Sequence, residues 1–99
     1  MRTDWLFPLI IVMEFPLGQL GRTPGVIQKI PESETLLAIQ RHALRDWGDV
    51  CEDDRLANEE ALEEGNRLLS VYYSSEGEKF WIITEWDRSA TTVLLPEEY

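Results

Sequence analysis

The residues best suited to chemistry are nine carboxylates between positions 46 and 64, among which stands a single cation, Arg55. Such a density of one charge weakens a compact fold by self-repulsion, but it attracts basic partners and speeds encounters with them. The candidate residues are Asp46, Asp49, Glu52, Asp53, Asp54, Glu59, Glu60, Glu63 and Glu64.

Two interpretations of these carboxylates remain open. They can be the solvated face of a helix, with the earlier acids serving as caps and loop residues. Alternatively they bind a partner, because Glu59 and Glu63, like Glu60 and Glu64, are like-charge pairs four residues apart that cost a few tenths of a kcal/mol each. Duplex DNA carries one phosphate charge per about 1.7 Å of its axis, so a row of carboxylates can resemble it to a basic groove. On this interpretation the chain is a decoy for a nucleic-acid-binding protein.

Carboxylates also bind Ca²⁺ and Mg²⁺, and the calcium-loop pattern tests that alternative. The pattern needs oxygen ligands at alternate positions, glycine at the sixth and glutamate at the twelfth. Counted from Asp46, the third and fifth positions are Gly48 and Val50, and the sixth is Cys51. We therefore predict no metal site and no cofactor.

Nucleophilic catalysis would have to use the only histidine, His42, together with the only cysteine, Cys51, or with a serine. Carboxylate surroundings raise a thiol pKa, which is the wrong direction for a nucleophile. We expect a surface or partly packed histidine and no enzymatic activity. A lone cysteine also excludes an intramolecular disulfide and is typical of a reducing cytoplasm, where we expect the protein to act.

A second polar group surrounds Asp87, Arg88 and Ser89, and it could bind a small polar ligand at the end of a strand. The simpler alternative is a hairpin held by Asp and Ser hydrogen bonds to its own backbone. Aromatic residues nearby could stack on bases, but no basic groove accompanies them, so we do not expect direct nucleic-acid binding.

These groups must be positioned by one domain spanning residues 1–99, because a chain of this size with 43% apolar residues supports one core. The sequence predicts an α+β fold in which two or three helices precede an antiparallel β-meander. A short helix is expected from Pro24 to about Ile30. An amphipathic helix should follow, with Ser33 as its N-cap, and end near Gly48; its apolar positions are Leu36, Leu37, Ala43, Leu44 and Trp47.

A further helix should begin at Asp53 or Asp54 and end at Gly65. Its inward residues are expected to be Leu56, Ala57, Ala61 and Leu62. Beyond it the period changes to two, which predicts a strand over 68–73, a hairpin loop over 74–78, a strand over 79–86, a turn at 87–89 and a strand over 91–95.

The apolar run from Trp5 to Val12 is interrupted by Pro8 and is too short to span a membrane. It lacks the cleavage pattern of a secretory signal, so we expect an N-terminal strand that joins the sheet. Residues 1–15 can also be an atypical extension or a strand exchanged between copies. Both a monomer and a homodimer are therefore open, because an exposed apolar edge promotes association.

Several short motifs stand out along the chain. They are Thr23-Pro24-Gly25, Asp46-Trp47-Gly48-Asp49, Asn58, Arg67-Leu68-Leu69-Ser70-Val71-Tyr72, Trp81-Ile82-Ile83-Thr84-Glu85, Asp87-Arg88-Ser89 and Thr91-Thr92-Val93-Leu94-Leu95-Pro96. Together they resemble a family of small bacterial proteins encoded on plasmids, integrative elements and phage-related islands. The resemblance covers roughly residues 16–99, although Trp86 stands where the family usually has a small residue. It implies a mobile-element gene and assigns no activity.

Mobile elements benefit from small proteins that obstruct DNA-targeting defences, whose DNA grooves are basic. The first hypothesis is thus an anti-CRISPR or anti-restriction inhibitor that occupies the basic nucleic-acid-binding groove of a host protein through the nine carboxylates. The alternative is a regulatory or ligand-binding module of a mobile element that uses the turn at Asp87-Arg88-Ser89.

Overall fold

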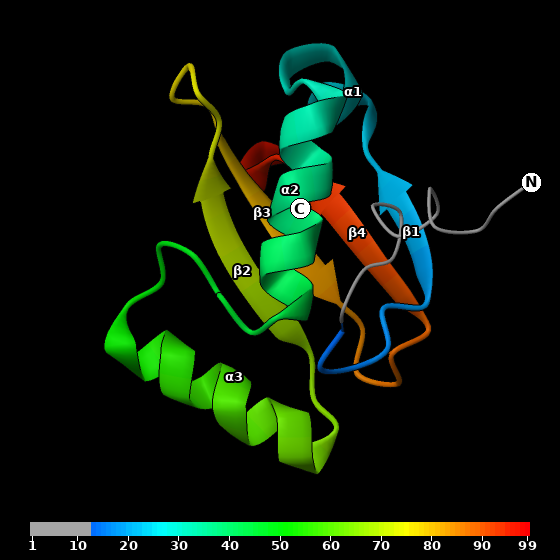
Figure 1. Cartoon of the computed structure of the whole chain (residues 1–99), viewed down its shortest axis with the longest axis vertical. Coiled ribbons are helices and arrows are strands. Elements are labelled where there is room, and N and C mark those ends of the chain that lie inside the picture. The colour runs from blue at the N-terminus through cyan, green and yellow to red at the C-terminus, as the bar shows by residue number, and fades with distance from the viewer. Residues whose placement is uncertain (1–12) are drawn as a thin grey trace, which may run out of the picture.

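A computed structural model describes residues 13–99, which form a four-stranded sheet with helices around it (Figure 1). The α+β class predicted from the sequence is confirmed. The elements are β1 Gln19–Arg22, α1 Pro24–Lys29, α2 Glu32–Ala43, α3 Glu52–Glu64, β2 Leu68–Tyr73, β3 Lys79–Thr84, β4 Ala90–Leu94 and a 3₁₀ helix, η2, at Pro96–Glu98.

The sheet is mixed, with the order β1-β4-β3-β2. The last three strands form the predicted antiparallel meander, whereas β1 pairs with β4 in parallel. The predicted meander is confirmed, and the sheet as a whole is mixed because β1 joins it in parallel. The helices α1, α2 and α3 lie between β1 and the next strand, and such a long connection permits parallel pairing. The N-terminal strand of this sheet is Gln19–Arg22, and the strand expected at 5–12 lies outside the described residues.

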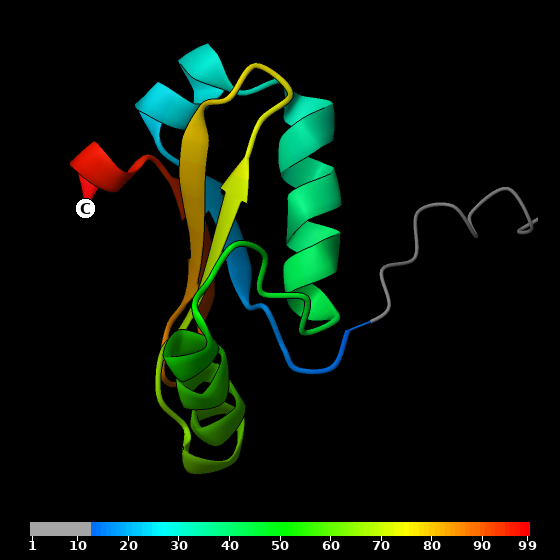
Figure 2. The same cartoon turned by 90° about the vertical axis from the view of Figure 1, so that its left-hand side faces the viewer.

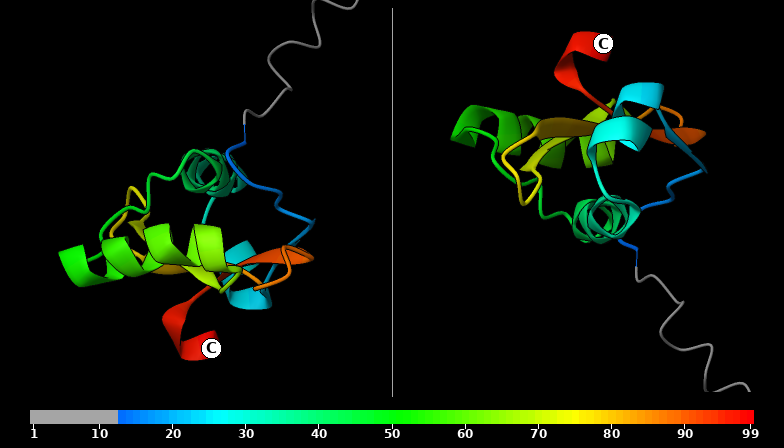
Figure 3. Two further views of the ribbon diagram at one scale, coloured as in Figure 1. Left: turned by 90° about the horizontal axis from the view of Figure 1, so that it is seen from below. Right: turned by 90° about the horizontal axis from the view of Figure 1, so that it is seen from above.

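The helices lie on different sides of the sheet. Figure 2 shows α2 against one face and η2 on the other side, and α3 lies at the end of the sheet where β2 begins. Viewed along α2, α3 runs across its direction (Figure 3). The core between α2 and the sheet is a cluster to which Val26, Ile39, Phe80, Ile82 and Val93 contribute.

The apolar face predicted for α2 is partly wrong. Leu36, Leu37 and Leu44 are exposed, while Thr35 and His42 are fully buried. Thr35 and His42 can occupy buried positions because their polar groups are hydrogen-bonded there. A prediction based on hydrophobicity alone therefore assigned the wrong residues to the buried face of α2. Ser33 is not the N-cap either: the helix begins after Pro31 and no side chain caps it.

The boundaries of α3 also differ from the prediction. It begins at Glu52 with Cys51 in the N-cap position, and neither Asp53 nor Asp54 caps it. Gly65 ends it as predicted, in the left-handed conformation with φ 76°.

The predicted inward face of α3 is correct for Ala61, which is buried, and for Leu62, which is partly buried and packs against the core. It is wrong for Leu56 and Ala57, which are exposed. The only side chains that α3 buries are Asn58 and Ala61. Polar contacts of Asn58 with Leu69 and of Glu59 with Trp47 therefore contribute to holding this helix on the protein.

Candidate functional site: the acidic surface of α3 and its entry loop

All nine predicted carboxylates lie on α3 or on the loop that leads to it, and eight of them are exposed. Asn58 and Ala61 fix the side of the helix that faces the protein. Residues spaced by three, four and seven share one side of a helix, which places Asp53, Glu60, Glu63 and Glu64 together on the opposite, outward side. Asp54 instead precedes Asn58 by one turn, and Asp46 and Asp49 belong to the loop.

Three of the nine carboxylates are neutralised by arginines. Arg41 Nε donates to Asp46 Oδ2 at 2.7 Å, and Arg55 Nη2 donates to Glu52 Oε2 at 2.6 Å. In both cases the arginine hydrogen bond holds the pKa of the carboxylate below its usual range.

Glu59 is the third neutralised carboxylate, and it joins α3 to the end of α2. Its carboxylate accepts hydrogen bonds from Arg45 and, at 2.9 Å, from Trp47 Nε1. These two donors lower the pKa of Glu59. Trp47 is buried, so Glu59 completes the bonding of a core side chain, and the predicted partner-binding set includes a residue that stabilises the fold.

No salt bridge among residues 13–99 involves the other six carboxylates, which are Asp49, Asp53, Asp54, Glu60, Glu63 and Glu64. Four of them are the outward group on α3. Leu56, which is 49% exposed, precedes Glu60 and Glu63 by four and seven residues and therefore lies on the same side. The outward side of α3 is thus an uncompensated acidic face with an apolar residue within it.

Asn58 is a structural residue whose role the sequence did not reveal. Its side-chain amide donates from Nδ2 to the Leu69 carbonyl at 2.8 Å and accepts at Oδ1 from the Leu69 N–H at 3.1 Å. The side chain therefore bonds to β2 as a neighbouring strand would. Asn58 is the one uncharged polar residue of α3, and that was the sequence signal that could have identified it.

Asp87 and Arg88, in the turn at 87–89, form hydrogen bonds with other groups of the protein. Asp87 Oδ1 accepts from the Ser89 N–H at 3.1 Å, which is the self-bonded hairpin of the simpler alternative. The Arg88 guanidinium donates to the carbonyls of Ala61 at 2.9 Å and Asn66 at 2.6 Å, and more weakly to those of Glu85 and Trp86. Arg88 thus joins the 87–89 turn to the C-terminal end of α3, where the Ala61 carbonyl also accepts from the amides of Gly65 and Asn66.

His42 is fully buried, which corrects the expectation of a surface or partly packed side chain. Its Nε2 and Nδ1 lie 2.8 Å from Thr84 Oγ1 and 2.6 Å from Ser70 Oγ. Thr84 in turn bonds to Thr91, whose hydroxyl donates to the Leu17 carbonyl.

The direction of this chain fixes the protonation of the imidazole. The Thr91 hydroxyl donates its only proton to the Leu17 carbonyl, so in its bond with Thr84 it must be the acceptor. Thr84 then donates to Thr91 and must itself accept from His42 Nε2–H. Ser70 can donate to Nδ1, so a neutral ring satisfies every group. Burial, with a smaller contribution from Arg88, lowers the pKa of His42 to about 3.

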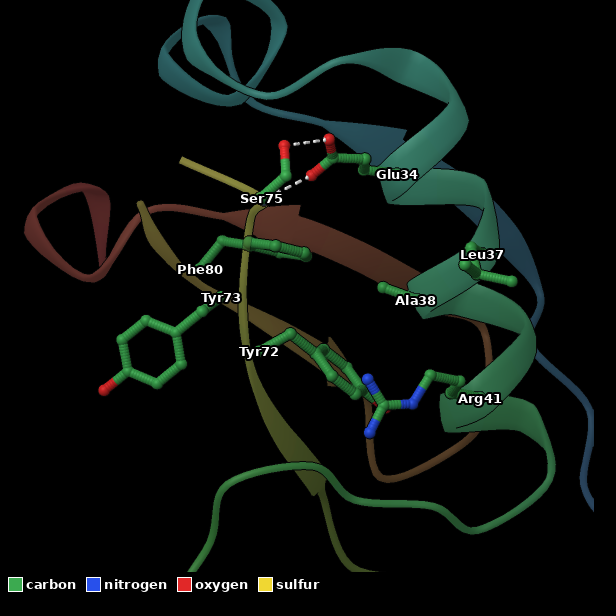
Figure 4. Close-up of a pocket in the computed structure, with 8 residues that line it drawn as sticks. All are labelled: Glu34, Leu37, Ala38, Arg41, Tyr72, Tyr73, Ser75 and Phe80. Atoms are coloured by element: carbon green, nitrogen blue, oxygen red, sulfur yellow. Dashed lines mark hydrogen bonds between the residues drawn. The ribbon is translucent and has the colours of Figure 1, made fainter. Parts of the chain in front are cut away.

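A cleft of about 320 Å³ lies between α2 and β2 (Figure 4). Its walls are mainly apolar, and its polar groups already have partners. Glu34 accepts from the backbone and hydroxyl of Ser75, while Arg41 lies over the Tyr72 ring and pairs with Asp46. No pair of free polar groups converges there.

Over residues 13–99, no three potential metal ligands come together, and no helix is long and apolar enough to cross a bilayer. Comparisons of the chain with protein-family models, curated proteins and solved structures gave no match.

Proposed function

We propose that this chain is an acidic binding protein, encoded by a mobile element, that inhibits a host defence system by occupying the basic nucleic-acid-binding groove of a host protein. The observation that carries the proposal is the outward side of α3, where Asp53, Glu60, Glu63 and Glu64 form no salt bridge within residues 13–99. Folding does not explain these charges, because a stabilising pattern would mix signs at this spacing.

Three other carboxylates of this chain make contacts that can stabilise the fold. Asp46, Glu52 and Glu59 each receive an arginine, and Glu59 also receives a buried indole N–H. The other six acids differ from these in their contacts, because none of them forms a salt bridge within residues 13–99. The predicted partner surface is therefore narrowed to the outward side of α3, with Asp49 and Asp54 at its margin.

The alternative function at Asp87-Arg88-Ser89 gains no support from the contacts of this turn. Arg88 is occupied by carbonyl oxygens and Asp87 by the Ser89 amide. A ligand would have to displace those bonds.

The test compares two triple variants with the same net charge. In the first, Glu60, Glu63 and Glu64 are replaced by lysine; in the control, Glu76, Glu78 and Glu97, which lie away from α3, are replaced by lysine. Glu59 is left unchanged because its reversal would disturb Trp47. Each protein is immobilised, exposed to host lysate at low and high salt, and then washed with duplex DNA.

The unmodified chain and the control should retain nucleic-acid-binding proteins at low salt and release them to DNA or to high salt, because exposed charges are screened over about 8 Å at physiological ionic strength. The α3 variant should retain none of them. Equal retention by both variants would show that net charge, and not this face, governs binding, and the proposal would fail.

A further inference from the structure

The outer edge of β1 is an open strand edge. The Gln19 amide donates to the Ser89 carbonyl at 2.9 Å, and the Thr23 amide donates to the Val93 carbonyl at 3.1 Å. Since backbone groups in a strand alternate in direction, those of Leu20 and Arg22 face away from β4. Within residues 13–99 nothing bonds to these outward groups, and all of β1 is exposed.

The other edge of the same sheet is blocked over Leu69 and Val71. Along β2, the Asn58 side chain bonds to both backbone groups of Leu69. The next outward residue, Val71, donates to the Trp47 carbonyl and accepts from the Asp49 amide. Strand edges left unpaired are templates for another strand, and only β2 has been blocked in this way.

An apolar hollow of about 140 Å³ accompanies the open edge, between β1 and α2. Leu20 and Leu36 line it and are 45% and 51% exposed. A strand added to β1 would cover both side chains, so the edge offers apolar contact as well as hydrogen bonds.

Charge at this edge is balanced, unlike that of the chain as a whole. Arg22 and Glu32 line the hollow, one of each sign, and neither has a salt bridge among the described residues. The acidic helix α3 contacts β2, at the opposite edge of the sheet. Two copies can therefore approach through β1 with their acidic faces far apart.

We propose that β1 pairs in antiparallel register with β1 of a second copy, with Leu20 of each chain opposite Arg22 of the other. In this register both outward residues exchange their N–H and C=O groups across the edge. The contact is self-complementary, as a two-fold dimer requires, and each Arg22 approaches Glu32 of the other copy. This inference concerns a different edge from the acidic face and does not depend on the proposed function.

Hydrogen exchange of the full chain, measured by NMR at micromolar and at millimolar concentration, tests the pairing. Exchange of the Leu20 and Arg22 amides should slow by about tenfold or more at the higher concentration, while sedimentation shows a dimer. Gln19, whose amide already bonds to Ser89, is the internal control.

Unprotected Leu20 and Arg22 amides in a dimer would overturn the proposal. So would protection of these amides in a sample that sedimentation shows to be monomeric, because it would mean that another segment of the same chain covers the edge.

A pair of leucine variants supplies the second test. Leu20→Lys places a cation opposite Arg22 of the second copy, and the exposed position should allow the chain to fold. Leu37→Lys makes the same change on α2, where Leu37 lines the cleft beside β2. Only Leu20→Lys should weaken the dimer, by about tenfold or more in its dissociation constant. Equal dimerisation of Leu20→Lys and the unmodified chain would refute β1 pairing.

Discussion

Between pH 7 and pH 5, acidification should destabilise this protein mainly through one side chain, the buried His42. Its pKa is about 3 in the folded chain and about 6.5 in an unfolded one. Between these pH values the unfolded state binds a proton that the folded state does not. The contribution of His42 to the free energy of unfolding is therefore fully present above about pH 6.5 and is lost as the pH falls towards 3. From pH 7 to pH 5 the contribution of His42 to the free energy of unfolding should fall by about 2 kcal/mol.

The physical basis of this loss is the chain of hydrogen bonds. A protonated ring has donors at both nitrogens, so Ser70 would have to become an acceptor at Nδ1. It would also place a buried positive charge near Arg88, with no carboxylate among the hydrogen-bond partners of the ring. The imidazole of His42 therefore binds a proton far more weakly in the folded state than in the unfolded chain.

Two measurements check this prediction. Urea unfolding at pH 7, 6 and 5 gives the slope, and His42→Gln, which cannot titrate, should show a much flatter slope over the same range. NMR of the imidazole gives the pKa directly, because His42 is the only histidine. An imidazole that titrates near pH 6.5 in the folded protein would refute the reasoning, as would an unchanged slope in His42→Gln.

Two further substitutions test how α3 and its entry loop are attached. Asn58→Ala removes both bonds to Leu69 and should lower the free energy of unfolding by about 1–3 kcal/mol, whereas Gln40→Ala, on the exposed side of α2, should have little effect in the same urea titration. Gly48→Ala should cost more than Gly65→Ala. Both glycines have a left-handed backbone, with φ 78° and 76°, and that conformation costs about 1 kcal/mol for alanine. Only at Gly48 would the added Cβ also lie 2.0 Å from the Val71 carbonyl oxygen. Equal losses at the two glycines would contradict the close approach of this loop to β2.

The meander was predictable from sequence because its strands are short and rich in aromatic and β-branched residues and its turns contain Gly77 and Asp87. The end of α3 was predictable for a similar local reason, since Gly65 is a residue that tolerates the left-handed conformation. Local chemistry determines each of these features.

The missed features depend on contacts between distant segments. Gln19–Arg22 has no strand pattern of its own, and only its pairing with β4 makes it a strand. His42 is buried because Ser70, Thr84 and Thr91 lie opposite it on the sheet, which no spacing along α2 can show. The nine carboxylates lie on a helix and its entry loop, as the sequence predicted, and their role as a binding surface stays a prediction. The sequence did not separate Glu59, which bonds to Trp47, from the acids that form no salt bridge within residues 13–99.

The way α3 is attached has an evolutionary consequence. Because the helix buries only Asn58 and Ala61 and is joined to β2 by one amide side chain, few of its positions are constrained by the core. Substitutions on its outward side should accumulate without loss of stability, as surface changes usually do. The helix could thus adapt to successive binding partners while the sheet beneath it stays the same.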